Sequence, residues 1–181
     1  DGELTGSQTF TVTVNPVNDA PVLDFVFDLN FDEDQSSSIL LTASDVDNTE
    51  LSFSVLGGSD IIATIDGSGL TFTASDNFNG SEEFTATVSD TELIDSQTFI
   101  VTVNPINDAP VIENVADQVI DEDNTMSLTL NAYDVEGDQL YFTASSNGNS
   151  SVSVVDNQLT LVPNLNYFGI IEVDVQVTDT Y

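Results

Sequence analysis

The chain has 181 residues, of which 32 are Asp or Glu and none is Lys, Arg or His, so its formal net charge is −32. No salt bridge can form between its side chains, and each carboxylate must be solvated, hydrogen-bonded to a neutral donor, or neutralised by an outside cation. The absence of basic side chains excludes nucleic-acid recognition and attraction to anionic lipid headgroups. The chain also has no Cys. The lack of His, Lys and Cys excludes Ser–His and Cys nucleophiles, Schiff bases, disulfides, and imidazole or thiolate metal sites.

A repeat of 89 residues organises the sequence. The stretch from Ser7 to Pro16 returns almost unchanged from Ser96 to Pro105, and Asn18-Asp19-Ala20-Pro21 returns at the same offset as Asn107-Asp108-Ala109-Pro110. The other matches, which need no gap, are Asp32-Glu33-Asp34 with Asp121-Glu122-Asp123, Asp45-Val46-Asp47 with Asp134-Val135-Glu136, Asn77-Phe78 with Asn166-Tyr167, and Val88-Ser89-Asp90 with Val177-Thr178-Asp179. Such self-similarity predicts tandem copies of one module.

Within each period the apolar residues alternate with polar ones, which is the pattern of half-buried β-strands. Thr, Val, Ile and Phe dominate these runs, as strands prefer. The predicted inward-facing sets are Ile39, Leu41 and Ala43; Leu51, Phe53 and Val55; Phe84, Ala86 and Val88; and Phe99, Val101 and Val103. Turn sequences such as Gly57-Gly58 separate the runs. About seven short strands per period, with no helical segment, predict an all-β fold of tandem immunoglobulin-like β-sandwich modules.

The two Asn-Asp-Ala-Pro segments are natural module boundaries, because Pro cannot donate to a strand ladder and stiffens the backbone. We therefore expect residues 1–17 to be the last strand of a preceding or neighbouring-chain module. Residues 18–106 then form the first complete module. Residues 107–181 form a second module that lacks its final strand.

The phase of these boundaries has two interpretations. Asp1, Asp90 and Asp179 are equivalent positions, so the sequence opens on the last strand of one module and closes just before that strand of another. We favour an excerpt of a longer array, because array repeats are common and donated strands are not. The alternative is a head-to-tail polymer in which residues 1–14 complete the open module of a neighbouring chain by strand addition.

Strand directions predict that acidic loops gather where modules meet. Asp45-Val46-Asp47 and Asp90 should lie at the end of the first module where its linker enters, and Asp32-Glu33-Asp34 at the opposite end, facing the next module. A dense cluster of anions with no basic partner predicts a hard cation with about six to eight oxygen ligands, which is calcium. Asp and Asn in turns often only hydrogen-bond their own backbone, so single motifs are weak evidence. The candidate ligands are Asn18, Asp19, Asp32, Glu33, Asp34, Asp45, Asp47, Asp90, Asn107, Asp108, Asp121, Glu122, Asp123, Asp134, Glu136, Asp138 and Asp179.

These motifs, with Asn77-Phe78-Asn79-Gly80 and the linker from Val103 to Pro110, resemble the bacterial cadherin-like tandem repeats of large secreted adhesins and surface proteins. The resemblance covers the whole chain and implies an extracellular, repetitive stalk with calcium at the inter-module junctions. By this resemblance Asp45 and Asp47 match an Asp-x-Asp ligand pair, and Glu33 and Glu122 an early-strand Glu ligand. The linker has fewer acidic residues than the linker of cadherins. The segment Asn77-Phe78-Asn79-Gly80 stands where cadherins carry an Asp-Arg-Glu motif. These departures imply fewer ions or a weaker site.

We expect an extracellular structural or adhesive array, acting as a stalk or filament, with calcium as its cofactor and no catalysis. Its expected partners are neighbouring similar repeats; a neighbouring chain and surface glycans stay open as further partners, whereas nucleic acid and direct membrane insertion are excluded. One rival is a carbohydrate-binding module of a secreted enzyme, which the lack of Trp and the presence of only 4 Tyr disfavour. The other rival is a passive, metal-free spacer. Phe78 and Tyr167 are expected to pack at a strand corner and not to stack on sugars.

Overall fold

The computed structural model describes residues 2–180, so the end residues 1 and 181 of two predicted ranges lie outside the described part. The chain divides into two compact units after Pro105. Within residues 2–180 all regular structure is β-strand and none is helix. The prediction of an all-β tandem sandwich is therefore confirmed.

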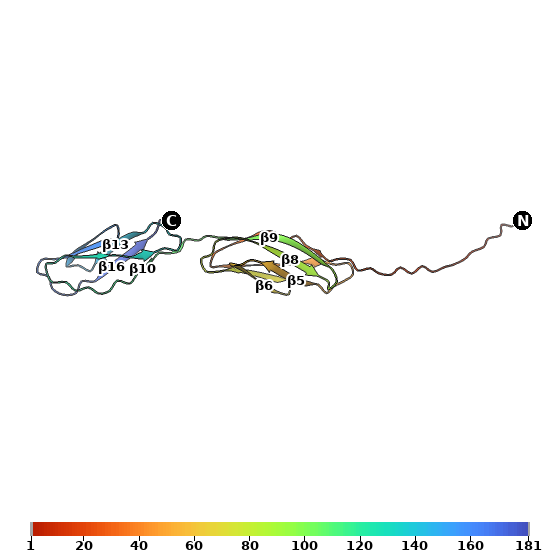
Figure 1. Ribbon diagram of the computed structural model, residues 1–181, viewed down its shortest axis with the longest axis horizontal. Coiled ribbons are helices and arrows are strands. Elements are labelled where there is room, and N and C mark those ends of the chain that lie inside the picture. The colour runs from red at the N-terminus through yellow and green to blue at the C-terminus, as the bar shows by residue number, and fades with distance from the viewer. Residues whose placement is uncertain (1, 181) are drawn as a thin grey trace. The chain divides into compact units, whose positions relative to one another are not determined.

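Unit 1 is a two-sheet sandwich. Its strands are β1 (Val22–Leu23), β2 (Leu29–Asp32), β3 (Ser36–Leu40), β4 (Ala43–Ser44), β5 (Ser52–Gly57), β6 (Ile61–Asp66), β7 (Gly69–Ala74), β8 (Gly80–Ser89) and β9 (Ile94–Asn104). One sheet has the order β2-β9-β8-β5 and the other β3-β7-β6, while β1 pairs with β4. All pairs are antiparallel except β2 with β9, and β8 and β9 lie side by side in Figure 1. The sequence predicts about seven strands, and unit 1 has nine. The number is higher because two of the expected strands are interrupted, one at residues 24–28 between β1 and β2 and one at residues 41–42 between β3 and β4.

The core of unit 1 follows the predicted alternation. Phe84, Ala86 and Val88 of β8 are fully buried, and the apolar residues of β9 from Phe99 to Val103 on the same face are nearly so. Phe72 of β7 crosses to the other sheet, with its ring centroid 5.2 Å from that of Phe84 and 5.9 Å from that of Phe99. These edge-to-face pairs add about 0.5–1.5 kcal/mol each beyond the area they bury. The two sheets are thus held together by rings from three strands.

Residues 2–20 precede the first strand and belong to no sheet. Phe10, Val12 and Val14 are 79%, 70% and 88% exposed, although the same sequence in β9 is buried. The exposed alternating face of this segment is therefore apolar and lacks the cover that β9 has.

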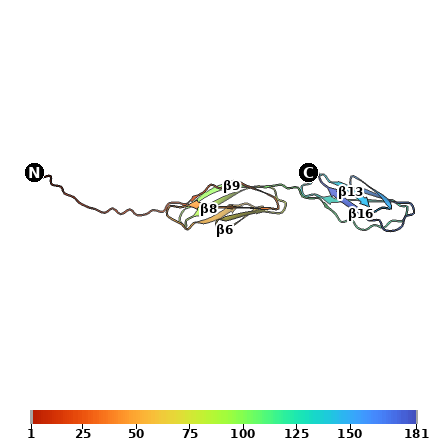
Figure 2. The same cartoon turned by 180° about the vertical axis from the view of Figure 1, so that it is seen from behind.

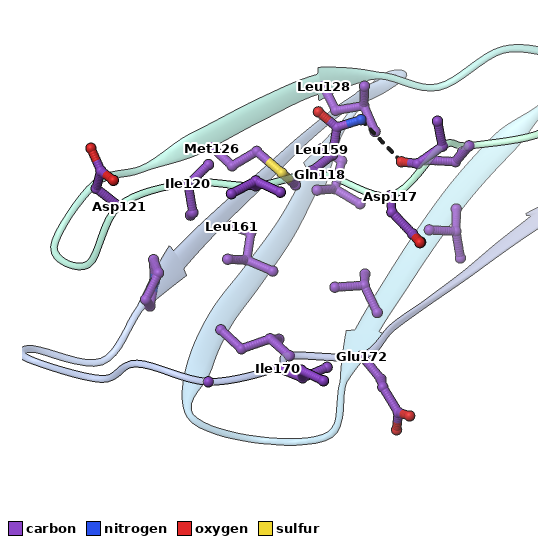
Figure 3. Close-up of a pocket in the computed structure, with 18 of the residues that line it drawn as sticks. Asp117, Gln118, Ile120, Asp121, Met126, Leu128, Leu159, Leu161, Ile170 and Glu172 are labelled. Atoms are coloured by element: carbon purple, nitrogen blue, oxygen red, sulfur yellow. Dashed lines mark hydrogen bonds between the residues drawn. The ribbon is translucent and has the colours of Figure 1, made fainter.

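Unit 2 repeats most of unit 1. Its strands are β10 (Val111–Ile112), β11 (Met126–Thr129), β12 (Ala132–Tyr133), β13 (Tyr141–Ser146), β14 (Ser150–Val155), β15 (Gln158–Pro163) and β16 (Val173–Thr178). The sheets are β11-β15-β14, β13-β16 and β10-β12, and Figure 2 shows β13 beside β16. The buried hydrophobic cluster of unit 2 is smaller than that of unit 1 and consists of Leu130, Leu159 and Leu161, the last two of which are labelled in Figure 3. Within residues 106–180 no strand occupies the place that β9 has in unit 1.

The effect of β9 on its neighbours is visible from this comparison. In unit 1, Gly80–Glu83 pair with β9 alone, because β5 reaches only residues 84–89. The equivalent residues 169–172 form no strand, and β16 begins only at Val173. Residues 118–121, which correspond to β2, also form no strand, since β2 pairs only with β9. Backbone groups without a ladder partner do not hold strand geometry.

Glu82 on β8 holds the turn between β5 and β6. Its carboxylate accepts hydrogen bonds from Ser59 Oγ at 2.6 Å, Ser59 N and Ile61 N at 2.9 Å, and Asp60 N at 3.2 Å. Partial burial alone would raise the pKa of Glu82, but these hydrogen bonds outweigh burial and lower the pKa from 4.5 to about 2. The carboxylate thus stabilises the fold in its charged form, with neutral donors in place of a basic residue. Unit 2 has Ile171 at the equivalent position.

We predict that Glu82→Gln destabilises unit 1 in a pH-dependent way. The folded pKa lies below the unfolded one, so the stabilisation is fully present above about pH 4.5 and is lost as pH falls toward about 2. Thermal unfolding by circular dichroism should show a gap in Tm between wild type and variant that narrows over that range. All four tyrosines follow residue 106, so tyrosine fluorescence separates the transition of unit 2. Glu83→Gln, on the exposed face of the same strand, is the matched control; a gap that is constant with pH would contradict the prediction.

Candidate functional site

Strand pairing brings three loops of unit 1 together. Val22 of β1 pairs with Ser44 of β4, so the entering segment with Asn18 and Asp19 lies beside the start of the loop 45–51. Ser52 of β5 pairs with Ser89 of β8, so the end of that loop lies beside Asp90. The sequence therefore places amide and carboxylate side chains from three segments at one end of the sandwich.

Asn18 links these segments. Its Nδ2 donates to Asp90 Oδ2 at 2.7 Å, and its Oδ1 accepts from Asn48 Nδ2 at 2.8 Å. The amide of Asp19 donates to Asp47 Oδ2 at 2.8 Å. We refer to Asn18, Asp19, Asp45, Asp47, Asn48 and Asp90 as the upper cluster of unit 1.

Asp45 in this cluster uses only one of its carboxylate oxygens. Oδ1 accepts from the amides of Asp47 and Asn48 at 2.7 Å, which is the turn-forming role expected of an Asp after a strand. Oδ2 is buried and has no hydrogen-bond partner. The local turn therefore accounts for one oxygen of Asp45 and leaves the other available to a cation.

Asp90 is held in its charged form. It is 6% exposed, and its Oδ1 accepts from the amides of Glu92 at 2.8 Å and Leu93 at 2.7 Å. The hydrogen bond from the Leu93 amide, followed by that from the Asn18 side chain, lowers the pKa of Asp90 below its ordinary value, although burial acts in the opposite direction. Asp90 is therefore a carboxylate at neutral pH.

Unit 2 has an upper cluster of the same design. Asn107 Nδ2 donates to Asp179 Oδ2 at 3.1 Å, the Asp108 amide to Glu136 Oε2 at 3.2 Å, and the Asp138 amide to Asp134 Oδ1 at 3.0 Å. Three oxygens here are buried without a hydrogen-bond partner: Asn107 Oδ1, Asp108 Oδ2 and Asp134 Oδ2. Asp134 is equivalent to Asp45, and the same atom lacks a partner in both units.

The acidic turns 32–34 and 121–123 lie before β3 and β11, at the opposite end of each unit from the upper cluster. Glu33 is 3% exposed, and its amide donates to Asn104 O of β9 at 3.0 Å, while Asp32 Oδ1 accepts from Asn104 Nδ2 at 3.1 Å. Glu122 is exposed, because residues 106–180 contain no counterpart of β9 to hold this turn. The carboxylates of Asp34 and Asp123 are exposed as well.

The chemistry of the upper clusters suits a hard cation, since every buried atom without a partner is an oxygen of Asp or Asn. Within residues 2–180 no group of three or more Asp or Glu side chains is arranged to hold a metal ion alone. A cation at an upper cluster would therefore also use amide and main-chain oxygens. Sequence reasoning missed Asn48, whose only signal was its position directly after Asp45-Val46-Asp47.

These features define a tandem immunoglobulin-like β-sandwich protein. The chain belongs to the family described as bacterial Ig domain, which matches residues 18–103 and again residues 107–181. Domains of this family are typically extracellular and non-catalytic. No curated protein matches the chain. Residues 2–180 include no helix that is long and apolar enough to cross a membrane.

Solved structures show where the same fold recurs. Human protocadherin-24 EC1-2 has a TM-score of 0.52 and 18% identity, with 90% of this chain and 88% of that chain covered. Protocadherin PcdhgB3 EC1-4 has a TM-score of 0.53 and 17% identity, with 88% and 45% covered. An endo-fucoidan hydrolase of glycoside hydrolase family 107 has a TM-score of 0.42 and 19% identity; 90% of this chain matches, but it spans only 27% of that enzyme. At these identities the likeness to the two protocadherins is one of fold.

We predict that Asn18→Asp lowers the Tm of unit 1 in metal-free buffer. The substitution replaces the donor 2.7 Å from Asp90 Oδ2 with a second carboxylate oxygen, and two like charges at that distance repel. The measurement is circular dichroism melting in EDTA. Asn30→Asp, on the exposed side of β2, adds the same charge elsewhere in unit 1 and serves as the control. Equal Tm values for the two variants would show that Asn18 does not hold the cluster together.

Proposed function

We propose that this chain is an extracellular structural or adhesive repeat array, whose modules bind calcium at their linker-facing ends and are stiffened by it into a stalk or filament. It carries out no catalytic step in this proposal. The observation that supports it most directly is the repeated buried oxygen of Asp45 and Asp134, which has no protein donor in either unit.

The free energy of burial is the reason that this oxygen calls for a cation. A buried carboxylate oxygen without a hydrogen bond loses its hydration and gains nothing in return, which costs about 1–3 kcal/mol or more for a charged group. The chain has no Lys, Arg or His to compensate it. Calcium would supply the missing positive charge, and the carboxylate and amide oxygens would coordinate it together.

Chain connectivity supports a bridging role for the ion between modules. Glu33 is tied by its amide to Asn104, and only three peptide steps separate Asn104 from Asn107, a reach of at most roughly 11 Å. In this proposal the linker ion uses the upper cluster of unit 2, that is Asn107, Asp108, Asp134, Glu136, Asp138 and Asp179, and Glu33 is the candidate ligand from unit 1.

The corresponding site before unit 1 would use its upper cluster, and the turn 121–123 would serve the following junction. Asp32 and Asp34 would add negative charge near the linker ion and would not need to coordinate the ion directly. Extracellular calcium modules have dissociation constants of about 10⁻⁴–10⁻³ M. At about 10 mM calcium, one such site stabilises the folded state by about 1.4–2.7 kcal/mol.

The direct experiment is a calcium titration of thermal stability with reversal by EDTA. We expect the Tm of unit 2, followed by tyrosine fluorescence, to rise in millimolar calcium and to fall again on chelation. Asp134→Asn should remove most of this rise, because it weakens the charge on the buried oxygen. Asp156→Asn, in the exposed turn between β14 and β15, changes the net charge equally and should leave the rise intact.

Two further measurements separate binding from screening and from stiffening. Sodium chloride at matched ionic strength controls for the general relief of self-repulsion in so acidic a chain. Small-angle scattering should show a longer, better-defined maximum dimension with calcium. A Tm that responds to sodium as it does to calcium would reduce the protein to a metal-free spacer; a calcium-specific Tm without elongation would refute the stiffening.

The carbohydrate-binding alternative has less support. The exposed aromatic pair Phe25 and Phe27, at 70% and 74% exposure, lies in the connection between β1 and β2 and not on a sheet face. The ring centroids are 4.7 Å apart with planes at 79°, so the two rings do not form a coplanar platform for a sugar. Phe78, as expected for a corner residue, packs against the core of unit 1.

A further inference from the structure

The two upper clusters differ at the residue that follows the acidic loop motif. Unit 1 has Asn48 directly after Asp45-Val46-Asp47, and unit 2 has Gly137 at the equivalent position, 89 residues later. Asn48 Nδ2 donates to Asn18 Oδ1 at 2.8 Å. Gly137 has no side chain that could donate, and Oδ1 of Asn107, the counterpart of Asn18, is buried without a hydrogen-bond partner. One difference between the repeats thus changes whether the protein itself satisfies this oxygen.

The two amides are otherwise oriented in the same way. Asn18 Nδ2 donates to Asp90 Oδ2 at 2.7 Å, and Asn107 Nδ2 donates to Asp179 Oδ2 at 3.1 Å. An ionised carboxylate only accepts hydrogen bonds, so the nitrogen of each amide must face the Asp and the oxygen must face away from it. The state of Oδ1 therefore depends on what the loop after β4 or after β12 provides.

The Asn48 side chain competes with a cation for Asn18 Oδ1. Its nitrogen lies 2.8 Å from that oxygen, close to where a coordinated calcium ion would lie, at about 2.3–2.6 Å. The amide hydrogen carries partial positive charge and takes one lone pair of the oxygen. An ion that uses Asn18 Oδ1 must displace Asn48 or make a weaker contact beside it. Among residues 2–180 no hydrogen-bond donor competes in this way for Asn107 Oδ1.

The other buried oxygens favour unit 2 as well. Asp108 Oδ2 and Asp134 Oδ2 join Asn107 Oδ1, so three buried oxygens of this upper cluster lack a hydrogen-bond partner in the described part of the chain. The upper cluster of unit 1 has one such oxygen, Asp45 Oδ2, and Asp19, the counterpart of Asp108, is exposed. Oxygens that are already desolvated and unpaired lose no hydrogen bond when a cation binds. Cation binding should therefore be more favourable at unit 2.

We propose that Asn48 lowers the calcium affinity of the upper cluster of unit 1, so that calcium fills the cluster of unit 2 first and that of unit 1 only at higher concentration. This inference rests on the proposed function and adds to it an order of filling and the residue that sets the order. In the metal-free protein Asn48 takes part of the role of a cation, since it satisfies Asn18 Oδ1. Unit 1 is accordingly less dependent on calcium for its stability than unit 2.

A calcium chloride titration followed residue by residue tests the order of filling. In proton–nitrogen correlation NMR spectra, the backbone amides of Asp19 and Asp47 report on unit 1, and those of Asp108 and Asp138 report on unit 2. Sodium chloride keeps the ionic strength constant. In the wild type we expect the unit 2 signals to reach half-saturation at a calcium concentration more than about threefold lower than the unit 1 signals do, as expected when at least one net hydrogen bond separates the two sites.

Asn48→Ala tests whether this residue is responsible. The variant keeps the backbone amide at position 48, which donates to Asp45 Oδ1 and holds the turn, and removes only the competing side chain. Half-saturation of the unit 1 signals should move to about two- to tenfold lower calcium, while the unit 2 signals stay unchanged. Thr49→Ala, at the exposed next position of the same loop, is the matched control and should change neither.

Thermal stability distinguishes competition from a purely structural role of Asn48. In EDTA, Asn48→Ala should lower the Tm of unit 1, because Asn18 Oδ1 loses its donor. In saturating calcium most of this difference in Tm should disappear, because the ion then satisfies the oxygen. A side chain that only packed or held the loop would lower the Tm equally in both buffers. Circular dichroism, with the tyrosine fluorescence of unit 2 as reference, separates the transition of unit 1.

The outcomes separate this inference from the function on which it rests. Calcium-specific shifts at both clusters with equal half-saturation, or an unchanged half-saturation of unit 1 in Asn48→Ala, would contradict the role of Asn48 and leave the calcium-binding array intact. The lack of a calcium-specific shift at either cluster would contradict the proposed function, and this inference with it.

Discussion

The structure depends on one electrostatic constraint: 32 carboxylates must be accommodated in a chain without a single basic side chain. Neutral donors solve this where the backbone can supply them. Glu82 takes three amides and a hydroxyl from one turn, and Asp90 takes two amides and the Asn18 side chain. In the upper clusters the donors satisfy one oxygen of Asp45 and of Asp134 and leave the other buried and unpaired. These are the positions at which we propose that an outside cation binds.

The second constraint is the dependence of the sandwich on β9. This strand orders β2, the first four residues of β8 and the turn at Glu33 in unit 1. Unit 2 keeps the remaining strands because their ladders close without it. Both constraints act at module ends: the upper cluster lies where the chain enters a module, and β9 carries the chain out of unit 1 past Glu33.

Much of the fold could be predicted, because strand alternation and an ungapped repeat are local signals. The buried faces of β8 and β9 are those expected from Phe84 and Phe99 onward, and strand direction placed Asn18 near Asp90. Long-range contacts could not be predicted. Glu33 and Glu122 have the same sequence context but opposite burial, because only Glu33 has Asn104 beside it. The role of Glu82 depends on a turn more than twenty residues earlier in the chain. The geometry of the loop decides which carboxylate oxygen of Asp45 lacks a hydrogen-bond donor.

The most direct measurement is anomalous diffraction from crystals of the 181-residue chain grown in millimolar calcium. We expect an anomalous peak about 2.3–2.6 Å from oxygens of Asn107, Asp108 and Asp134. An equivalent peak should lie beside Asp45. Water alone at both clusters, in well-ordered density, would contradict the claim that a divalent cation neutralises these loops.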